Sequence, residues 1–366
     1  MNFLKLNIPN EFVVALEKEE ITTPTAIQEK AIPKLIEKSN AYISSETGTG
    51  KTLAFLLPIL AKLDIDSKKL QAIILTPTHE LASQIQNQIL RLKQNSNLDF
   101  RAQLLIGGGS AKRQLEKLKK KPHIIVGSPG RILDFIKLKK IKTHFVETIV
   151  IDEADKMLLD ESVMLIDNIL RALPRDVQKV FVSATNQPKS NSIARKMCGE
   201  IIEIHAGSNK ISKKIEHIFI IVRENEKLAE LLKFFLKTKP RKSIVFAHKN
   251  ETAKIIAKHL SANGIAAVEI HGARDKHQRV QTIAGFRKGK IKVLVASDIA
   301  ARGLDFNDIT HIINFDVPGQ SKNYLHRAGR TGRMGKKGCC VSLLSPEEKN
   351  VPKRFEKELK IQTKLL

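Results

Sequence analysis

Short apolar runs alternate with amphipathic stretches along most of the chain. In the first part, six such runs are too short for helices and predict buried strands. They lie at 41–44, 72–75, 103–106, 123–126, 148–151 and 180–183. Between them, segments such as 79–93 and 110–120 have the spacing of amphipathic helices. This alternation predicts βαβ units, that is, an α/β fold with a parallel sheet covered by helices on both faces.

The alternation is interrupted once and then resumes. The stretch 206–214 is small and polar, which indicates a linker. Beyond it, six more apolar runs predict a second set of strands, at 218–222, 243–246, 267–270, 292–297, 311–315 and 339–344. A chain of 366 residues also exceeds what one hydrophobic core usually organises. We therefore predict two tandem domains, 1–205 and 215–366, joined by this linker.

Charge gives the first indication of function. The chain has 63 Lys+Arg against 38 Asp+Glu, a formal net charge of +25, which is typical of proteins with phosphate-rich partners. A solvated lysine-rich surface is the alternative explanation. The first 206 residues carry a net +7 and the remainder a net +18, so the second domain is the more basic. With 15 Phe, 2 Tyr and no Trp, base stacking is disfavoured, and contact with the phosphate backbone is expected instead.

Two further features indicate the compartment. No stretch approaches the roughly 18 apolar residues that a membrane span needs, and the first residues lack the apolar segment of a signal peptide. The three cysteines, Cys198, Cys339 and Cys340, match neither a disulfide framework nor a zinc site. We expect a cytoplasmic monomer with reduced cysteines and no membrane partner.

A candidate phosphate-binding loop follows the predicted strand at 41–44. The segment SETGTGKT, from Ser45 to Thr52, leads into an apolar helix. In such loops, backbone N–H groups and a helix N-terminus bind phosphate, a lysine reaches the β- and γ-phosphates, and a hydroxyl ligates Mg²⁺. Lys51 and Thr52 fit the last two roles. Ser45 stands where the strict pattern has Gly, so the strand–loop–helix setting carries the prediction.

An acidic pair ends the predicted strand at 148–151. Phosphoryl transfer to water needs a carboxylate that holds Mg²⁺ and a group that orients the attacking water. Asp152 suits the first role and Glu153 the second. The same residues could simply form an acidic helix N-terminus, which the helix dipole favours. The phosphate loop a hundred residues earlier favours the catalytic interpretation.

Further motifs accompany these two in a fixed order. In the first part they are Phe3 with the PTAIQ segment ending at Gln28, the loop at 45–52, PTHELA (77–82), Gly107-Gly108, SPGR (128–131), Asp152-Glu153-Ala154-Asp155 and Ser183-Ala184-Thr185. In the second part they are VFAHKN (245–250), ASDIAARGLD (296–305) and HRAGRTGR (326–333). Over essentially its whole length, the chain resembles the DEAD-box RNA helicases of helicase superfamily 2. The resemblance implies two RecA-like domains and an ATP-dependent RNA helicase.

The resemblance also implies an ATP site to which both domains contribute. Gln28 would read the adenine edge and Phe3 would pack over the base, which selects ATP over GTP. Arg330 and Arg333 would be arginine fingers that neutralise charge on the γ-phosphate, with binding of RNA phosphate as the alternative for both. Other residues implied to bind ATP are Thr23, Glu46, Thr47, Gly48, Thr49, Gly50 and, on the ribose, Asp305.

RNA is the second ligand that the resemblance implies. The residues implied to contact its phosphates and 2′-hydroxyls are Thr78, Gly108, Pro129, Gly130, Arg131, His271, Gly272 and Ser297. Those implied to couple the ATP site to the domain interface are Asp155, Ser183, Thr185 and His326. Hydrolysis would depend on RNA, and short duplexes would be pried apart locally. Ribosomal or RNA-decay assemblies are the partners expected at the level of the family.

Several positions depart from the family pattern. His79 stands where the family usually has Arg, so a permanent bidentate phosphate donor is replaced by a weaker group. The other departures are Ser45, Ser128 and Ser297, which keep size or hydroxyl, and Glu20 and Lys276, for which there is no physical account. Two alternatives stay open: a DNA-directed helicase of the same superfamily, disfavoured by the PTAIQ segment and the Asp-Glu-Ala-Asp tetrad, and a non-hydrolysing RNA clamp, disfavoured by Glu153.

Overall fold

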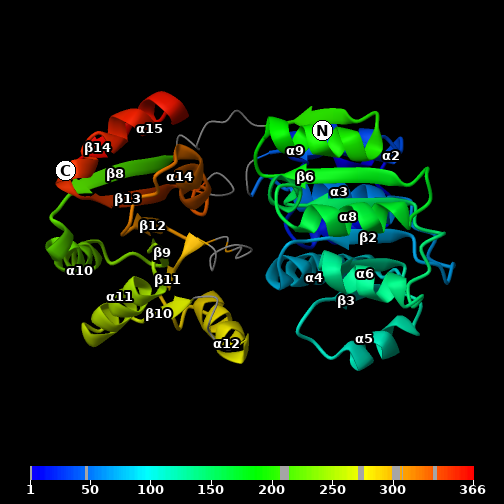
Figure 1. Cartoon of the computed structure of the whole chain (residues 1–366), viewed down its shortest axis with the longest axis horizontal. Helices are drawn as coiled ribbons and strands as arrows, with labels where there is room; N and C mark the ends of the chain where they lie inside the picture. The colour runs from blue at the N-terminus through cyan, green and yellow to red at the C-terminus, as the bar shows by residue number, and fades with distance from the viewer. Residues whose placement is uncertain are drawn as a thin grey trace. The chain divides into compact units, whose positions relative to one another are not determined.

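The chain folds into two compact units, Met1–Gly207 and Ser208–Leu366, in a computed structural model (Figure 1). The structure describes residues 2–45, 48–206, 214–270, 276–298, 306, 308–332 and 336–366, without the side chains of Lys276, His277, Val280 and Lys322. The predicted linker 206–214 lies outside the described residues except at its two ends.

The first unit contains a seven-stranded sheet in its described part, and every strand pair is parallel. The strand order is β3-β4-β2-β5-β6-β1-β7. The strands are β1 (Ala41–Ser44), β2 (Ala72–Leu75), β3 (Ala102–Leu105), β4 (Ile124–Gly127), β5 (Thr148–Asp152), β6 (Gln178–Ser183) and β7 (Ile202–His205). Six of the seven follow the predicted apolar runs to within two residues, because strands buried on both faces are apolar throughout.

Helices cover both faces of this sheet (Figure 1). One face carries η1 (Phe3–Leu6), α1 (Asn10–Glu17), α2 (Ala26–Ile36), α3 (Lys51–Ala61) and α4 (His79–Ser96). The other carries α5 (Ala111–Leu118), α6 (Pro129–Lys137), α7 (Ala154–Met157), α8 (Ser162–Arg171) and α9 (Pro188–Cys198). Each face buries its own apolar core, with Leu57 and Ile89 in one and Phe135 and Ile166 in the other.

The second unit repeats this plan. Its described strands form a parallel sheet of order β10-β11-β9-β12-β13-β8-β14. They are β8 (Ile215–Ile221), β9 (Ser243–Phe246), β10 (Ala267–Ile270), β11 (Val293–Ala296), β12 (His311–Asn314), β13 (Gly338–Leu344) and β14 (Thr363–Leu365). One face carries η2 (Glu224–Glu226), α10 (Lys227–Thr238) and α11 (Asn250–Ala262). The other carries α12 (Lys276–Arg287), α14 (Ser321–Ala328), η4 (Pro346–Glu348) and α15 (Val351–Leu359).

The predicted fold class, two RecA-like parallel sheets with helices on both faces, is confirmed. Two edge strands, β7 and β14, were not predicted from the sequence. In β7, apolar and charged residues alternate because one side is partly open, and β14 is a short polar strand held by its pairing with β8. Near the C-terminus, η4 and α15 are separate helices, because Pro352 lies in the first turn of α15. Among the described helices, none has the length and apolar content needed to cross a bilayer.

Candidate functional site

Strand order in the first unit sorts the sequence motifs into two groups. Parallel strands present their carboxyl ends at one edge of the sheet, where ligands of open α/β folds bind. The neighbours β5, β6 and β1 bring Asp152, Ser183 and the loop 45–52 to one half of that edge. The neighbours β3, β4 and β2 bring the segments 106–109, 128–131 and 76–79 to the other half. Candidate nucleotide residues and candidate RNA residues therefore lie side by side along one edge.

The phosphate loop depends on its glycines. Gly48 and Gly50 have φ values of 81° and 90°, which residues with a Cβ rarely adopt. A Cβ on Gly50 would also lie 2.4 Å from Gln28 Nε2. Lys51 begins α3, and its ammonium donates to the carbonyl of Ser45 within the same loop. Of the predicted loop residues, Glu46 and Thr47 lie outside the described residues.

Gln28 joins α2 to this loop. Its Oε1 accepts from Thr25 N at 2.9 Å as part of a capping box, and its Nε2 donates to the carbonyl of Gly50 at 2.9 Å. The side chain is 1% exposed. One N–H and one lone pair are left for the predicted adenine contact. Phe3 is fully buried in the core and Thr23 is exposed, and the packing of Phe3 over the base stays a prediction.

The acidic pair lies at the end of β5. Glu153 adopts a left-handed φ of 53° and precedes α7, an unusual backbone for a residue with a side chain and one that clusters at functional sites. Its N–H donates to Asp152 Oδ1 at 2.9 Å, and its carboxylate pairs with Lys156 Nζ at 2.7 Å. Sequence reasoning missed Lys156, although its spacing of three residues from Glu153 in a helical turn could have indicated the pair.

Burial raises the pKa of the Asp152 carboxyl to about 7, and the negative charge of Glu153 acts in the same direction. The charges of Lys51 and Lys156 and the N–H of Glu153 oppose this rise without cancelling it. A half-buried carboxyl beside a second carboxylate is therefore short of positive charge. This is the electrostatic environment into which a divalent cation fits.

The tetrad at the end of β5 is tied to the end of β6. Thr185 Oγ1 donates to Asp155 Oδ2 at 2.6 Å, and Asp155 is 3% exposed. Ser183 Oγ accepts from Thr185 N at 3.0 Å and donates to the carbonyl of Thr185 at 2.5 Å. These bonds fix the turn after β6 against α7. Three of the four residues implied to couple the ATP site to the domain interface, Asp155, Ser183 and Thr185, thus form one connected network.

The candidate RNA residues occupy helix starts and tight turns. Thr78 caps α4 by accepting from Leu81 N at 3.3 Å. Gly108 has a φ of 67°, and a Cβ on the adjacent Gly107 would approach His79 Nε2 to 3.5 Å. His79, where weaker binding of RNA phosphate is predicted, is therefore a direct neighbour of the Gly107-Gly108 turn.

The turn after β4 contributes the rest of this group. Pro129 and Gly130 begin α6, and a Cβ on Gly130 would have no atom within 4 Å. The guanidinium of Arg131 lies 5.5 Å from the centre of the Phe135 ring. Its Nη1 is buried and lacks a hydrogen-bond partner among the described residues. An anion such as a phosphate would supply that partner.

In the second unit, an arginine that sequence reasoning left unassigned organises the motif residues. Arg327, 2% exposed, donates from Nε and Nη2 to the two carboxylate oxygens of Asp298 at 2.7 Å each. Its Nη1 donates to Asn314 Oδ1 at 3.0 Å and to the carbonyl of Asp316 at 2.7 Å. Of the predicted residues, Ser297 follows β11, His326 lies in α14 and Arg330 follows it, while His271, Gly272, Asp305 and Arg333 lie outside the described residues.

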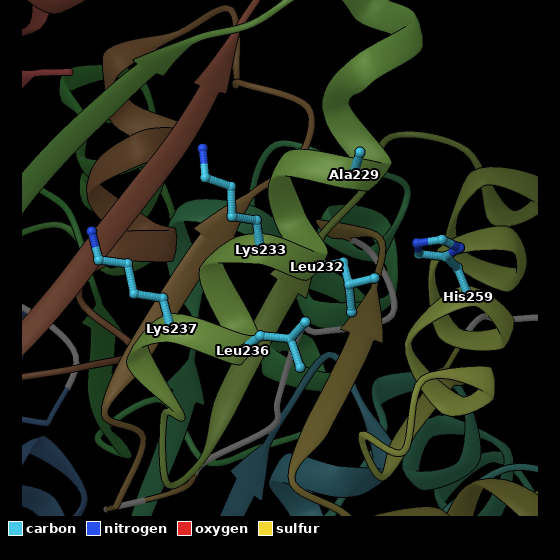
Figure 2. Close-up of a pocket in the computed structure, with 6 residues that line it drawn as sticks. All are labelled: Ala229, Leu232, Lys233, Leu236, Lys237 and His259. Atoms are coloured by element: carbon cyan, nitrogen blue, oxygen red, sulfur yellow. The ribbon is translucent and has the colours of Figure 1, made fainter.

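An apolar hollow elsewhere in the second unit is separate from these motifs. Figure 2 shows Leu232 and Leu236 of α10 facing it, with His259 of α11 on its other side. None of the predicted site residues that the structure describes lines this hollow. It lies between two helices and not at the carboxyl edge of the sheet.

Comparisons with known proteins agree with this arrangement. Residues 25–193 match the DEAD/DEAH box helicase family and residues 224–335 match the helicase conserved C-terminal domain. The chain is 38% identical to the DEAD-box ATP-dependent RNA helicase CshC of Bacillus cereus, covering 95% of this chain and 88% of the relative. It is 34% identical to the DEAD-box ATP-dependent RNA helicase RhpA of Helicobacter pylori, covering 100% and 74%. Its fold is similar to that of S. cerevisiae Dbp5 bound to RNA and ADP BeF3, with a TM-score of 0.88, 27% identity and coverage of 100% and 95%.

Proposed function

We propose, because the chain belongs to the family of DEAD-box ATP-dependent RNA helicases, that its two units divide one reaction between them. The protein is an ATP-dependent RNA helicase that couples RNA-stimulated ATP hydrolysis to local unwinding or remodelling of RNA. The single observation that carries the proposal is the carboxyl edge of the first unit's sheet, where β5-β6-β1 hold the candidate nucleotide residues and β3-β4-β2 the candidate RNA residues.

The first unit binds ATP through the loop 45–52. Its backbone N–H groups and the start of α3 receive the phosphates, and Lys51, freed from Ser45, approaches the β- and γ-phosphates. Gln28 holds the loop against α2 and uses its remaining donor and acceptor on adenine. Thr23, Glu46, Thr47, Gly48 and Thr49 complete this part of the proposal.

Hydrolysis uses the acidic pair. Glu153 orients the attacking water, and Lys156 holds its carboxylate in place beforehand. Thr52 and Asp152 would hold Mg²⁺, which the shortage of positive charge around Asp152 accommodates. When bound, Mg²⁺ supplies charge neutralisation on the phosphates. Arg330 and Arg333 of the second unit are proposed to neutralise the γ-phosphate in the transition state, and Asp305 to bind the ribose.

RNA is proposed to bind through its phosphates and 2′-hydroxyls. The first unit offers Thr78, Gly108, Pro129, Gly130 and Arg131, and the second offers His271, Gly272 and Ser297. The buried, unpartnered Nη1 of Arg131 supports a phosphate contact at that position among the described residues. His326, with the Asp155–Thr185–Ser183 network, is proposed to couple RNA binding to hydrolysis.

Stimulation by matched nucleic acids tests this assignment. ATP turnover is measured with RNA and with DNA of the same sequence and length, at equal salt. We expect strong stimulation by RNA and little by DNA, because contacts to the 2′-hydroxyl separate the two. Equal stimulation by both would favour a DNA-directed helicase, and RNA binding without any turnover would favour a clamp. A cytoplasmic monomer acting on ribosomal or RNA-decay assemblies is our expectation for the cellular setting.

A further inference from the structure

The most concentrated positive charge of the first unit lies on α5 and the turn after it. Between residues 112 and 121 the chain carries six basic side chains and one acidic one. The basic residues are Lys112, Arg113, Lys117, Lys119, Lys120 and Lys121, here called the α5 ridge. All six are exposed. In the described part of the chain, no ion pair or side-chain hydrogen bond is found for any of them.

The ridge is held in a fixed position beside the candidate RNA turn. Gln114, 9% exposed, accepts from Ile106 N at 3.1 Å and donates to the carbonyl of Ile106 at 3.0 Å. Ile106 directly precedes the Gly107-Gly108 turn at the end of β3, the edge strand of the sheet (Figure 1). Leu115 and Leu118 pack against the core under the helix. One side of α5 is thus fastened to the sheet edge, next to Gly108.

Most of the basic residues are not placed to stabilise the helix that carries them. Lys112 and Arg113 lie in the first turn of α5, where the helix dipole disfavours positive charge. Arg113 and Lys117 are four residues apart, a spacing at which like charges repel. Only Lys117 and Lys119, at the C-terminal end, are placed favourably. Helix stability therefore does not explain the ridge, whereas an external polyanion would.

We propose that the α5 ridge binds RNA phosphates that lie outside the strand gripped by the motif residues. Arg113 and Lys117 are one helical turn apart on α5, and Lys120 lies in the turn directly after the helix, so the three follow one another along the chain from the end of α5 that is nearer in sequence to the Gly107-Gly108 turn. A strand held at Gly108 continues along these three residues. The proposal rests on the proposed RNA-binding function and names a second segment of the same ligand.

The test combines one ridge variant with one matched control. The ridge variant carries Arg113→Gln, Lys117→Gln and Lys120→Gln, and the control carries Lys137→Gln, Lys140→Gln and Lys142→Gln. Both remove three exposed positive charges from the same unit. Glutamine is polar and uncharged and suits a helix. A single Lys117→Glu variant repeats the experiment with less change to the surface, and circular dichroism verifies the fold of each.

Affinity is measured for uridine oligonucleotides of increasing length, with a non-hydrolysable ATP analogue, at several salt concentrations. For the shortest oligonucleotide that fully stimulates ATP turnover, all proteins should bind alike. For longer ones, the ridge variant should bind about tenfold more weakly than the wild type at low salt. Its salt slope should be shallower by roughly two, since each lost phosphate contact on a single strand removes about 0.7. The control variant should keep the wild-type length dependence.

Three results would overturn the proposal that the α5 ridge binds RNA. The first is unchanged affinity of the ridge variant for long RNA, and the second is an equal loss of affinity in the control variant. The third is an equal loss of affinity for the shortest oligonucleotide, which would place these residues within the motif-bound site. In each case the wild type would still show RNA-stimulated turnover. If the wild type itself showed none, the proposed function would fail instead, so the two failures are separable.

Discussion

Thr185 Oγ1 and Asp155 Oδ2 are joined by a 2.6 Å hydrogen bond that links the ends of two neighbouring strands, β6 and β5. Asp155 is 3% exposed, and its other oxygen, Oδ1, is buried without a hydrogen-bond partner in the described structure. A bond to a buried carboxylate is stronger than one between neutral groups. The Thr185 hydroxyl is therefore the principal support of the Asp155 side chain.

Replacing Thr185 by Val should uncouple hydrolysis from RNA. Valine keeps the shape but cannot donate, so Asp155 loses its partner and the first unit should lose about 1.5–3 kcal/mol of stability. We expect ATP affinity within about threefold of the wild type and RNA-stimulated turnover reduced about tenfold or more. Denaturant titration and steady-state turnover measure the two effects. Thr238→Val, an exposed position in the second unit, should change neither. Undiminished turnover would remove Thr185 from the coupling path.

Glu153→Gln should abolish turnover and preserve binding. The amide is isosteric but is a poor acceptor for a proton from water, so the loss should be at least a hundredfold. RNA and ATP affinities should stay near those of the wild type. Single-turnover hydrolysis and anisotropy titrations measure these quantities. Glu161→Gln, an exposed residue at the start of α8, is the matched control. If Glu153→Gln hydrolysed ATP normally, another group would have to orient the water.

Gly50→Ala should weaken ATP binding. The new Cβ would lie 2.4 Å from Gln28 Nε2, and a φ of 90° is strained for any residue with a side chain. Adding Gln28→Ala removes the close contact but also the proposed adenine contact, and the backbone strain remains, so the double variant should not recover affinity. Gly319→Ala, where a Cβ would meet no atom within 4 Å, should be neutral. Calorimetric titration with an ATP analogue compares the four proteins, and full affinity in Gly50→Ala would show that the loop rearranges freely.

Acid should destabilise the second unit through His217. Burial lowers the pKa of this side chain to about 4, and its Nδ1 lies 2.8 Å from the Tyr324 hydroxyl. Because the unfolded state, with a pKa of about 6.5, binds the proton more readily, stability falls as pH drops below about 6.5 and continues to fall until about 4. Between pH 7 and pH 5 the loss should be about 2 kcal/mol.

Urea titrations at the two pH values measure this loss. In His217→Gln the difference between pH 7 and pH 5 should shrink by about that amount, because the titrating group is gone. His248→Gln, an exposed histidine of the same unit, should behave as the wild type. An unchanged pH dependence in His217→Gln would assign the acid sensitivity to other groups.

The sequence by itself determined the strands, the motifs and the family. Strands buried on both faces must be apolar along their length, so runs such as 72–75 and 243–246 mark them without reference to any partner. The sequence also identifies the glycines that need a positive φ, Lys51 and the acidic pair. Backbone preference and charge are properties of the residues themselves. Strands that are only partly buried, such as β7 and β14, lack a continuous apolar run, so the sequence did not identify them.

Only the tertiary structure decided which of these residues meet. The order of the strands placed Asp152 beside Ser183 and left Thr78 with the Gly107-Gly108 turn, and no local pattern encodes that order. The hydrogen bond from Gln28 to the carbonyl of Gly50 joins residues that are 22 positions apart in the chain. The forked contact of Arg327 with Asp298 spans 29 positions. Such contacts depend on how whole elements pack, and packing is set by the fit of buried side chains rather than by any single segment.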